Sequence, residues 1–209
     1  MAVVITVAQQ KGGAGKTMLA ANLAAAMAGK RRVAVVDIDP QHSLTRWHQL
    51  RTERLQEAAS LTFSDVAGWR LATELDRLKR AHDIVIIDSP PQIDTDAKLA
   101  VRGADLVLIP VQPSPPDLWA AEGTLKLAAD EGRRARLVLN RAPALSRLRE
   151  QVEAEIAERK LPTLRATLGN RTGFAIAFAE GLGVTEAAPR STAAAELTAL
   201  VAEIRKLTG

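Results

Sequence analysis

A glycine-rich segment close to the start of the chain has the residue types and spacing of a phosphate-binding loop. Residues 11–17 read Lys-Gly-Gly-Ala-Gly-Lys-Thr, after an apolar run and before a segment with helical spacing. Glycines let backbone N–H groups turn inward around phosphate oxygens, and a lysine placed like Lys16 reaches the terminal phosphates. The Thr17 hydroxyl is suited to bind Mg²⁺. The segment therefore predicts a site for a nucleoside triphosphate, against the alternative of a plain glycine-rich turn.

The loop departs from the general pattern Gly-x-x-x-x-Gly-Lys-Thr at its first position. That position falls on Gln10, and a second lysine, Lys11, follows it. We interpret the departure as the deviant form of the loop, which carries an additional lysine.

Acidic residues follow two other apolar runs. Asp37 and Asp39 are two residues apart, so on an extended chain they lie on the same side and can face Mg²⁺ and an attacking water. Asp88 ends another apolar run, an arrangement in which a carboxylate holds Mg²⁺, often through a water. Turn-forming aspartates and a helix cap are the alternatives. The sequence predicts metal ligands among Thr17, Asp37 and Asp88.

Two further segments follow later apolar runs. The side-chain amide of Asn140, next to Arg141, could pair with the edge of a base or simply form a turn. Residues 110–116 are rich in proline and precede Asp117. Because proline has a fixed φ and no N–H, we expect this segment to be a rigid loop.

The elements that must position these residues alternate along the chain. Continuous apolar runs predict strands at residues 3–8, 33–38, 84–87, 106–111 and 137–139. Helical spacing predicts helices at residues 17–28, 44–57, 69–81, 118–131, 145–159 and 192–207. The alternation predicts an α/β fold, a doubly wound and mostly parallel sheet flanked by helices, in a single domain over residues 1–209. Such sheets bind ligands at the carboxyl ends of their strands.

Composition limits the remaining possibilities. With 209 residues and 47% hydrophobic side chains, the chain has material for one well-buried core. Only 3% of the residues are aromatic, so we expect an aliphatic core. There is no cysteine, which excludes disulfides, thiol catalysis and iron–sulfur clusters. We see no signal peptide and no apolar stretch near the roughly 20 residues that span a bilayer, and we expect a soluble, cytoplasmic protein.

The loop, the Asp-x-Asp-Pro-Gln segment at residues 37–41 and the acidic strand end at Asp88 together resemble the ParA/MinD group of deviant Walker A P-loop ATPases. The resemblance covers nearly the whole chain. It is strongest to the short plasmid-partition ParA proteins of the ParF type, which lack an N-terminal helix-turn-helix domain. This chain has Pro90-Pro91 where that family more often has glycines.

The resemblance implies ATP and Mg²⁺ as cofactors and an ATP-dependent homodimer. It implies that Lys11 reaches the nucleotide of the other subunit, that Asp39 positions or activates the attacking water and that Asp37 supports the metal shell. It also implies that Asn140 contacts the base. We therefore expect Lys11, Lys16 and Asp39 to be catalytic. The expected cofactor-binding set is Lys11, Gly12, Gly13, Ala14, Gly15, Lys16, Thr17, Met18, Asn140 and Arg141.

Basic residues predict an anionic partner. The net charge is +4, and residues 133–171 hold ten lysines and arginines against four glutamates. The resemblance implies binding of double-stranded DNA without sequence preference, through contacts to phosphates. Arg171 and Arg190 best match the basic positions of the family, and the other candidates are Arg147, Arg149, Arg165, Arg205 and Lys206. A solvated charged surface is the alternative.

The first functional hypothesis is a partition ATPase that segregates plasmid or chromosome DNA. In this hypothesis a small centromere-binding or adaptor protein stimulates slow ATP hydrolysis, and the protein is associated with the nucleoid. The alternative is a positioning ATPase for a protein cargo, such as a microcompartment or a chemoreceptor cluster. A P-loop metabolic enzyme and a MinD-like membrane-associated ATPase rank lower. Residues 196–209 contain no aromatic side chain, which favours a packed helix over a membrane anchor.

Overall fold

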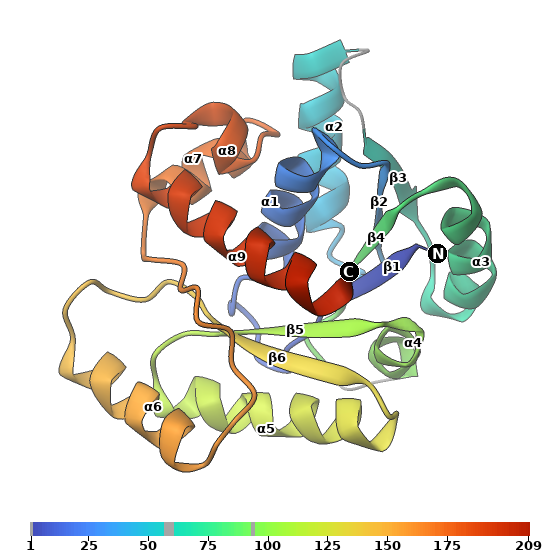
Figure 1. Cartoon of the computed structure of the whole chain (residues 1–209). Helices are drawn as coiled ribbons and strands as arrows, with labels where there is room; N and C mark the ends of the chain where they lie inside the picture. Colours follow the sequence, from blue (N-terminus) through green and yellow to red (C-terminus); the bar gives the residue numbers. More distant parts are fainter. Residues whose placement is uncertain (1, 57–60, 93–94) are drawn as a thin grey trace.

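A central parallel sheet with helices on both faces forms the framework of the molecule (Figure 1). The computed structural model describes residues 2–56, 61–92 and 95–209. The strand order is β3-β2-β4-β1-β5-β6, and every neighbouring pair is parallel. The strands are β1 (Val3–Val7), β2 (Val33–Asp37), β3 (Leu61–Asp65), β4 (Ile84–Asp88), β5 (Leu106–Val111) and β6 (Arg134–Leu139). This arrangement confirms the predicted α/β doubly wound sheet.

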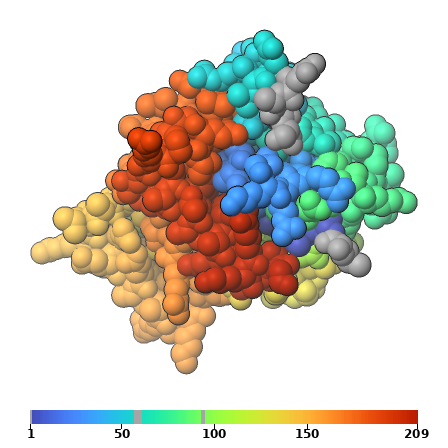
Figure 2. All heavy atoms as spheres, turned by 45° about the horizontal axis from the view of Figure 1, so that its top comes forward, coloured from blue at the N-terminus to red at the C-terminus, as the bar shows by residue number. Residues whose placement is uncertain are grey.

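Helices connect the strands and form a C-terminal group. The connecting helices are α1 (Lys16–Ala28), α2 (Ser43–Leu55), α3 (Leu71–Ala81), α4 (Thr95–Gly103) and α5 (Pro115–Asp130), and α6 (Arg147–Glu158) follows β6. A short 3₁₀ turn, η2 (Gly68–Arg70), precedes α3. The C-terminal group comprises α7 (Thr172–Ala179), α8 (Val184–Ala187) and α9 (Thr192–Thr208). In Figure 2 this group, orange to red, packs against the blue N-terminal part of the chain.

Successive strand residues pack on opposite faces of the sheet. Ile5 and Val7 belong to a core shared with α1, α2 and the C-terminal helices, whereas Val4 belongs to a core shared with α3 and α4. A third core joins β5 and β6 to α5 and α6. Because both faces of the sheet are covered, the strands inside it are largely apolar, which explains the apolar runs in the sequence.

The strand register brings the ends of β1, β2 and β4 to one level. Asp88 pairs with Val7 on one side and with Asp37 on the other. The loops that follow these strands therefore meet at the carboxyl edge of the sheet, where parallel α/β folds bind their ligands.

Several elements lie outside the predicted pattern. The sheet has a sixth strand, β3, at its edge, with the sequence Leu-Thr-Phe-Ser-Asp, and only its first residue is buried. A half-exposed edge strand does not produce a continuous apolar run, so the sequence did not signal it. Helices α4, α7 and α8 were also not predicted; they have nine, eight and four residues, too few for a clear helical period.

The proline-rich segment is mostly regular structure, so the prediction of a loop over residues 110–116 was wrong. Pro110 lies in β5, just past the residues that pair with β1, where the sheet needs no N–H from it. Pro115 starts α5, because the first turn of a helix has no use for its missing N–H. Ser114 is the N-cap and accepts a hydrogen bond from the N–H of Asp117. The loop is reduced to residues 112–114.

Other boundaries differ by a few residues. Helix α2 ends at Leu55, and Glu57, the end of the predicted helix 44–57, lies outside the described residues. Strand β6 begins three residues before the predicted Leu137, at Arg134. Within the described parts of the chain, none of the helices has the length and apolar character needed to cross a membrane.

Candidate nucleotide-binding site

The glycine-rich loop connects β1 to α1 in backbone conformations that favour glycine. Gly13 and Gly15 have φ values of 78° and 92°, in the left-handed region. A Cβ on Gly15 would lie 2.5 Å from the side-chain nitrogen of Asn140, whereas Cβ atoms on Gly12 or Gly13 would have no described neighbour within 4 Å. The loop is thus closed on the Asn140 side and open on the other.

The carbonyl groups of the loop are bound by side chains from the ends of β5 and β6. The Gly13 carbonyl accepts hydrogen bonds from Gln112 at 3.0 Å and from Arg141 at 3.3 Å. The Ala14 carbonyl accepts one from Asn140 at 2.9 Å. Carbonyls held by the surrounding protein leave the loop N–H groups to face an anion, which is the geometry of a phosphate cradle.

Lys16 begins α1 and is only 6% exposed. Burial lowers the pKa of its ammonium group, and the nearby carboxylates of Asp88 and Asp39 act in the opposite direction. A buried lysine at a helix N-terminus, beside two carboxylates and a glycine loop, is placed to bind a polyanion.

Asp88 ends β4 and is fully buried. Neither carboxylate oxygen has a hydrogen bond of normal geometry to any described group. Burial raises its pKa to about 8, while contacts with Thr17 and Lys16 act to lower it and the carboxylates of Asp37 and Asp39 add to the rise. Such an orphaned carboxylate costs free energy unless a cation or a bound water satisfies it.

This donor set fits Mg²⁺ bound together with a nucleotide. The described residues contain no cluster of three or more His, Cys, Asp or Glu side chains that could hold a metal alone. Mg²⁺ characteristically uses one or two protein oxygens and completes its shell with phosphate oxygens and water. The Thr17 hydroxyl and the Asp88 carboxylate are the groups that would hold it.

Asp37 and Asp39 differ in their surroundings. Asp37 accepts hydrogen bonds from the Thr45 N–H at 2.9 Å, the Thr45 hydroxyl at 2.8 Å and the Asp39 N–H at 3.1 Å. Burial raises the pKa of Asp37, and these hydrogen bonds oppose the rise. Among the described residues, the Asp39 carboxylate accepts the Gln41 N–H at 3.0 Å, and Asp39 lines the same pocket as Lys16. Asp37 therefore anchors the start of α2, and Asp39 faces the pocket; a metal role for Asp37 remains a prediction.

The side chain of Asn140 is engaged within the protein. Its Nδ2 donates to Ala14, and its Oδ1 accepts the Arg141 N–H at 3.0 Å. Arg141 has a φ of 51° and lines the pocket, whereas Asn140 lies beneath the loop. The predicted contact between Asn140 and a base therefore remains a prediction, and the contact it makes in this structure is to the loop.

Lys11 lies at the entrance of the loop and is bound within its own chain. Its ammonium group forms an ion pair with Asp117, near the start of α5. Asp117 is 2% exposed and also accepts the Ser114 hydroxyl at 2.5 Å. Lys11 itself is 41% exposed, so it lies at the surface beside the site.

A pocket of about 290 Å³ is lined by residues 12, 13 and 15–18 of the loop and α1 and by Asp39, whereas the predicted site residues Lys11, Ala14, Asp37, Asp88 and Asn140 are not among its lining residues. Most predicted loop residues line it, and Arg141 closes one side. Four lining residues were not predicted: Gln41, Ser43, Pro91 and Phe178. The first three follow strand ends that sequence analysis had already marked, so their positions carried a signal. Phe178 comes from α7, far along the chain, and no sequence pattern connected it to the loop.

The two predicted DNA-binding arginines lie near one groove. Arg171 is the N-cap of α7, and Arg190 lies just before Ser191, the N-cap of α9. Residues 170–173 and residues 188 and 191–193 line a groove between these helix starts. Arg171 forms an ion pair with Glu196 at 2.7 Å, whereas Arg190 is exposed. The structure brings the two arginines to one region, and their binding to DNA remains a prediction.

The site and the fold together define the class of protein to which this chain belongs. The chain belongs to the CobQ/CobB/MinD/ParA nucleotide-binding domain family, whose model matches residues 5–184. The protein is therefore a ParA/MinD-type P-loop protein, as the resemblance in the sequence indicated.

Similarity to individual relatives indicates which members of the family this chain resembles. Maintenance of carboxysome distribution protein A of Halothiobacillus neapolitanus is 31% identical over 202 residues, which cover 92% of this chain and 91% of the relative. Chromosome-partitioning ATPase Soj of Thermus thermophilus is 34% identical over 152 residues, 60% of this chain and 59% of the relative. Among solved structures, apo McdA of Cyanothece covers all of both chains with a TM-score of 0.82 at 18% identity, which shows the shared fold. The comparisons favour the positioning alternative over the partition hypothesis.

Proposed function

We propose that this protein is an ATP-hydrolysing switch that positions a protein cargo of the microcompartment class. The observation that carries the switch is the convergence of Lys16, Asp39 and the unpaired carboxylate of Asp88 at one glycine loop. The proposal of a protein cargo is supported by the relative named for carboxysome distribution, because that relative matches over nearly the whole chain.

The loop and Lys16 bind the triphosphate. Loop N–H groups and the N-terminus of α1 face the phosphates, and Lys16 neutralises charge on the terminal oxygens. Thr17 and Asp88 would hold Mg²⁺, which would supply positive charge to the phosphates. Asp39 lies at the pocket and orients the water that attacks the γ-phosphate. This division of roles makes Lys16 essential for binding and Asp39 essential for turnover.

Lys11 connects nucleotide binding to dimerisation. In the single chain its ammonium group is paired with the buried Asp117. In the proposed dimer Lys11 leaves this partner and contacts the phosphates bound by the other subunit. The phosphates bound by the other subunit carry more negative charge than the single carboxylate of Asp117. They therefore compete effectively for the Lys11 ammonium group. ATP binding therefore favours the closed dimer.

The dimer is proposed to bind double-stranded DNA through basic side chains of the C-terminal region. The net charge of +4 and the exposed Arg190 support this step. An adaptor protein on the cargo stimulates hydrolysis and releases the dimer from DNA. Cycles of binding and release on the nucleoid then distribute the cargo.

Partition of plasmid or chromosome DNA is the second candidate function. It is favoured by the similarity to the chromosome-partitioning ATPase Soj, although that match covers 60% of this chain. Both functions use the same switch, so the two candidates differ only in what the adaptor carries.

Two measurements test the proposal. The first compares retention of the protein on DNA of arbitrary sequence with Mg-ATP, with Mg-ADP and without nucleotide; retention with Mg-ATP alone is expected. The second replaces the gene in its host by the Asp39→Ala variant and follows cargo positions and plasmid loss. Clustered cargo with normal plasmid inheritance supports positioning, whereas plasmid loss with normal cargo positions supports partition.

A further inference from the structure

Two apolar side chains that are distant in sequence line the nucleotide pocket. They are Met18, in the first turn of α1, and Phe178, near the end of α7. The rest of the lining is glycine, charged or polar, apart from Pro91. A nucleotide has a charged phosphate half and a flat, largely apolar base. The phosphate half fits the loop, so the base fits the apolar surface that Met18 and Phe178 provide.

We propose that Phe178 packs against the adenine base of the bound nucleotide and that Trp47 and Arg51 of α2 hold its ring in place. This inference rests on the proposed binding of ATP at the glycine loop. It adds a base-contacting residue and two positioning residues that the loop motif does not contain.

Phe178, Trp47 and Arg51 form a continuous stack that begins at the pocket. The rings of Phe178 and Trp47 are stacked, with centroids 6.4 Å apart and planes at 22°. The guanidinium carbon of Arg51 lies 5.4 Å from the centre of the Trp47 ring on α2. Trp47 is fully buried, and its indole N–H donates to the Leu182 carbonyl at 3.3 Å. Phe178 is therefore held by a side chain that is itself fixed.

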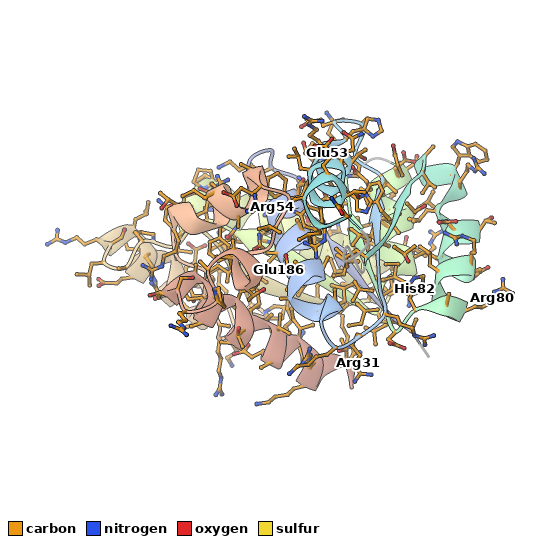
Figure 3. All side chains as sticks on the ribbon, turned by 90° about the horizontal axis from the view of Figure 1, so that it is seen from above. Arg31, Glu53, Arg54, Arg80, His82 and Glu186 are labelled. Atoms are coloured by element: carbon orange, nitrogen blue, oxygen red, sulfur yellow. The ribbon has the colours of Figure 1, made fainter. Side chains whose placement is uncertain are left out.

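The inner end of the stack is held by a bidentate ion pair. Arg51 is 1% exposed and donates to both carboxylate oxygens of Glu186 in α8, each at 2.7 Å. Figure 3 labels Glu186 on the side of the C-terminal helices that faces α1 and α2. Glu186 also accepts the Gly183 N–H at 2.8 Å, which fixes the start of α8. The stack thus joins the pocket, the helix that follows Asp39 and the C-terminal helices.

Adenine fits the apolar surface of Met18 and Phe178 better than a purely polar ligand would. Aromatic rings in offset stacks gain about 0.5–1.5 kcal/mol beyond the burial of their area, which corresponds to roughly twofold to tenfold in affinity. Met18 is flexible and polarizable and can fill the space beside the base. Ring contact requires no particular hydrogen-bond partner, so it does not depend on the side chain of Asn140, which is bound to the loop.

Binding measurements on Phe178 variants provide the first test. Phe178→Leu should weaken Mg-ADP binding about twofold to tenfold and leave binding of inorganic tripolyphosphate unchanged, because only ADP has a base. Phe178→Tyr should retain the affinity for ADP, since it keeps the ring. Ile176→Leu is the matched control, because Ile176 lies on the same helix and is 58% exposed. ADP is used because it lacks the γ-phosphate that the dimer requires.

Trp47 provides a second readout. The chain has three tryptophans, and Trp69 and Trp119 are exposed, so replacing both by Phe leaves Trp47 as the reporter. Mg-ADP should change the Trp47 fluorescence, and tripolyphosphate should not. This readout keeps the inference testable if Phe178→Leu fails to fold.

Each outcome has a distinct meaning. Equal ADP affinity of Phe178→Leu and the wild type, or a fluorescence change with tripolyphosphate equal to that with ADP, would overturn the role of Phe178. If the wild type binds neither ADP nor tripolyphosphate, the phosphate-loop proposal on which the inference rests is overturned instead. Selective loss of ADP affinity supports both.

Discussion

Lys16 and Asp88 are buried titratable groups, and the carboxylate of Asp88 lacks the partners that a buried carboxylate normally has. Asp88 has no hydrogen bond of normal geometry to the described residues, and burial raises its pKa to about 8. Burial also lowers the pKa of Lys16. Proteins keep such arrangements mainly where a ligand completes them, because an unsatisfied buried charge costs stability. At the scale of single residues, the site is therefore arranged for a bound polyanion and cation.

Lys16→Ala should abolish measurable binding of Mg-ATP. Removal of the ammonium group takes away the charge that the loop presents to the terminal phosphates, a loss of about 3 kcal/mol or more. Isothermal titration calorimetry provides the measurement. The control is Lys126→Ala, since Lys126 is exposed on α5 and should have no effect. Tight binding of Mg-ATP by Lys16→Ala would show that the loop is not the nucleotide-binding site.

Asp39 and Asp37 should give different phenotypes despite their spacing. Asp39→Ala should bind ATP, lose at least about tenfold in hydrolysis rate and accumulate as the ATP-bound form, because its carboxylate faces the pocket. Asp37→Ala should lower the unfolding temperature, because Asp37 holds Thr45 and the Asp39 N–H. Phosphate release and thermal unfolding measure the two effects. Identical behaviour of the two variants would contradict the division of roles.

The sequence was sufficient to locate residues that lie next to strand ends. The loop, Asp39 and Asp88 follow apolar runs, and parallel sheets bring such positions together. It did not find Phe178, which reaches the pocket only through the packing of α7 against α1 and α2. Nor did it show that Asn140 binds the loop, because this depends on a separation of 126 residues in the chain.

At the scale of elements, strong and continuous patterns were predicted well and short or mixed ones were not. Five strands were predicted from apolar runs; four of them, β2, β4, β1 and β5, lie inside the sheet, and β6 lies at one edge. Strand β3 lies at the edge and mixes polar with apolar residues, so it gave no such run. The prolines of residues 110–116 predict a loop because proline has no backbone N–H to donate. Pro110 and Pro115, however, occupy positions where no hydrogen bond is lost.

The ion pair between Arg51 and Glu186 should be the main polar link between α2 and the C-terminal helices. Glu186→Gln should destabilise the protein by about 2–3 kcal/mol, because it leaves a buried guanidinium group without its counter-charge. Denaturant unfolding gives the measurement. Arg54→Ala is the control: its pair with Glu180 also joins α2 to the C-terminal region but is exposed, so the loss should be below about 1 kcal/mol. Equal losses would show that burial does not strengthen the pair.

The same pair predicts a pH dependence. Burial alone would raise the pKa of Glu186, but hydrogen bonds from Arg51 and Gly183 outweigh it, and the net pKa is lowered. A carboxyl group with a lowered pKa in the folded state contributes stability above its unfolded pKa of about 4.3 and loses it as the pH falls through the folded value. The stability difference between the wild type and Glu186→Gln should be full above about pH 5 and shrink below about pH 4. A difference that grows on acidification would have the wrong sign.

At the scale of the whole molecule, the nucleotide pocket and the C-terminal helices are adjacent, because Phe178 of α7 lines the pocket. The pocket lies at the carboxyl edge of the sheet, and Arg171 and Arg190 lie at the starts of α7 and α9. Figure 2 shows these helices as the orange to red surface. The stack of Phe178, Trp47 and Arg51 links the pocket to these helices. These packed side chains provide a physical contact between the proposed nucleotide site and the C-terminal helices.

Arg190→Glu should weaken ATP-dependent retention on DNA. Each phosphate contact contributes about 0.9 to the slope of log affinity against log salt, so the slope should fall by about one unit. Filter retention over a range of salt concentrations measures this. The control is Arg80→Glu on α3, which Figure 3 places on the far side of the sheet from the C-terminal helices. Arg171 is less suitable, because charge reversal there would also place two acidic groups together at Glu196. An unchanged slope would remove Arg190 from the DNA surface.

In the proposed switch, ATP joins two copies of the chain, and Lys11 leaves Asp117 to contact the nucleotide of the other subunit. Sedimentation velocity with Mg²⁺ and a non-hydrolysable ATP analogue tests this dimerisation directly. The mass should double from 22.4 kDa with the analogue and stay at that of one chain with Mg-ADP, and Lys11→Ala should remain a single chain in both. A wild-type protein that binds the analogue and remains a single chain would contradict it.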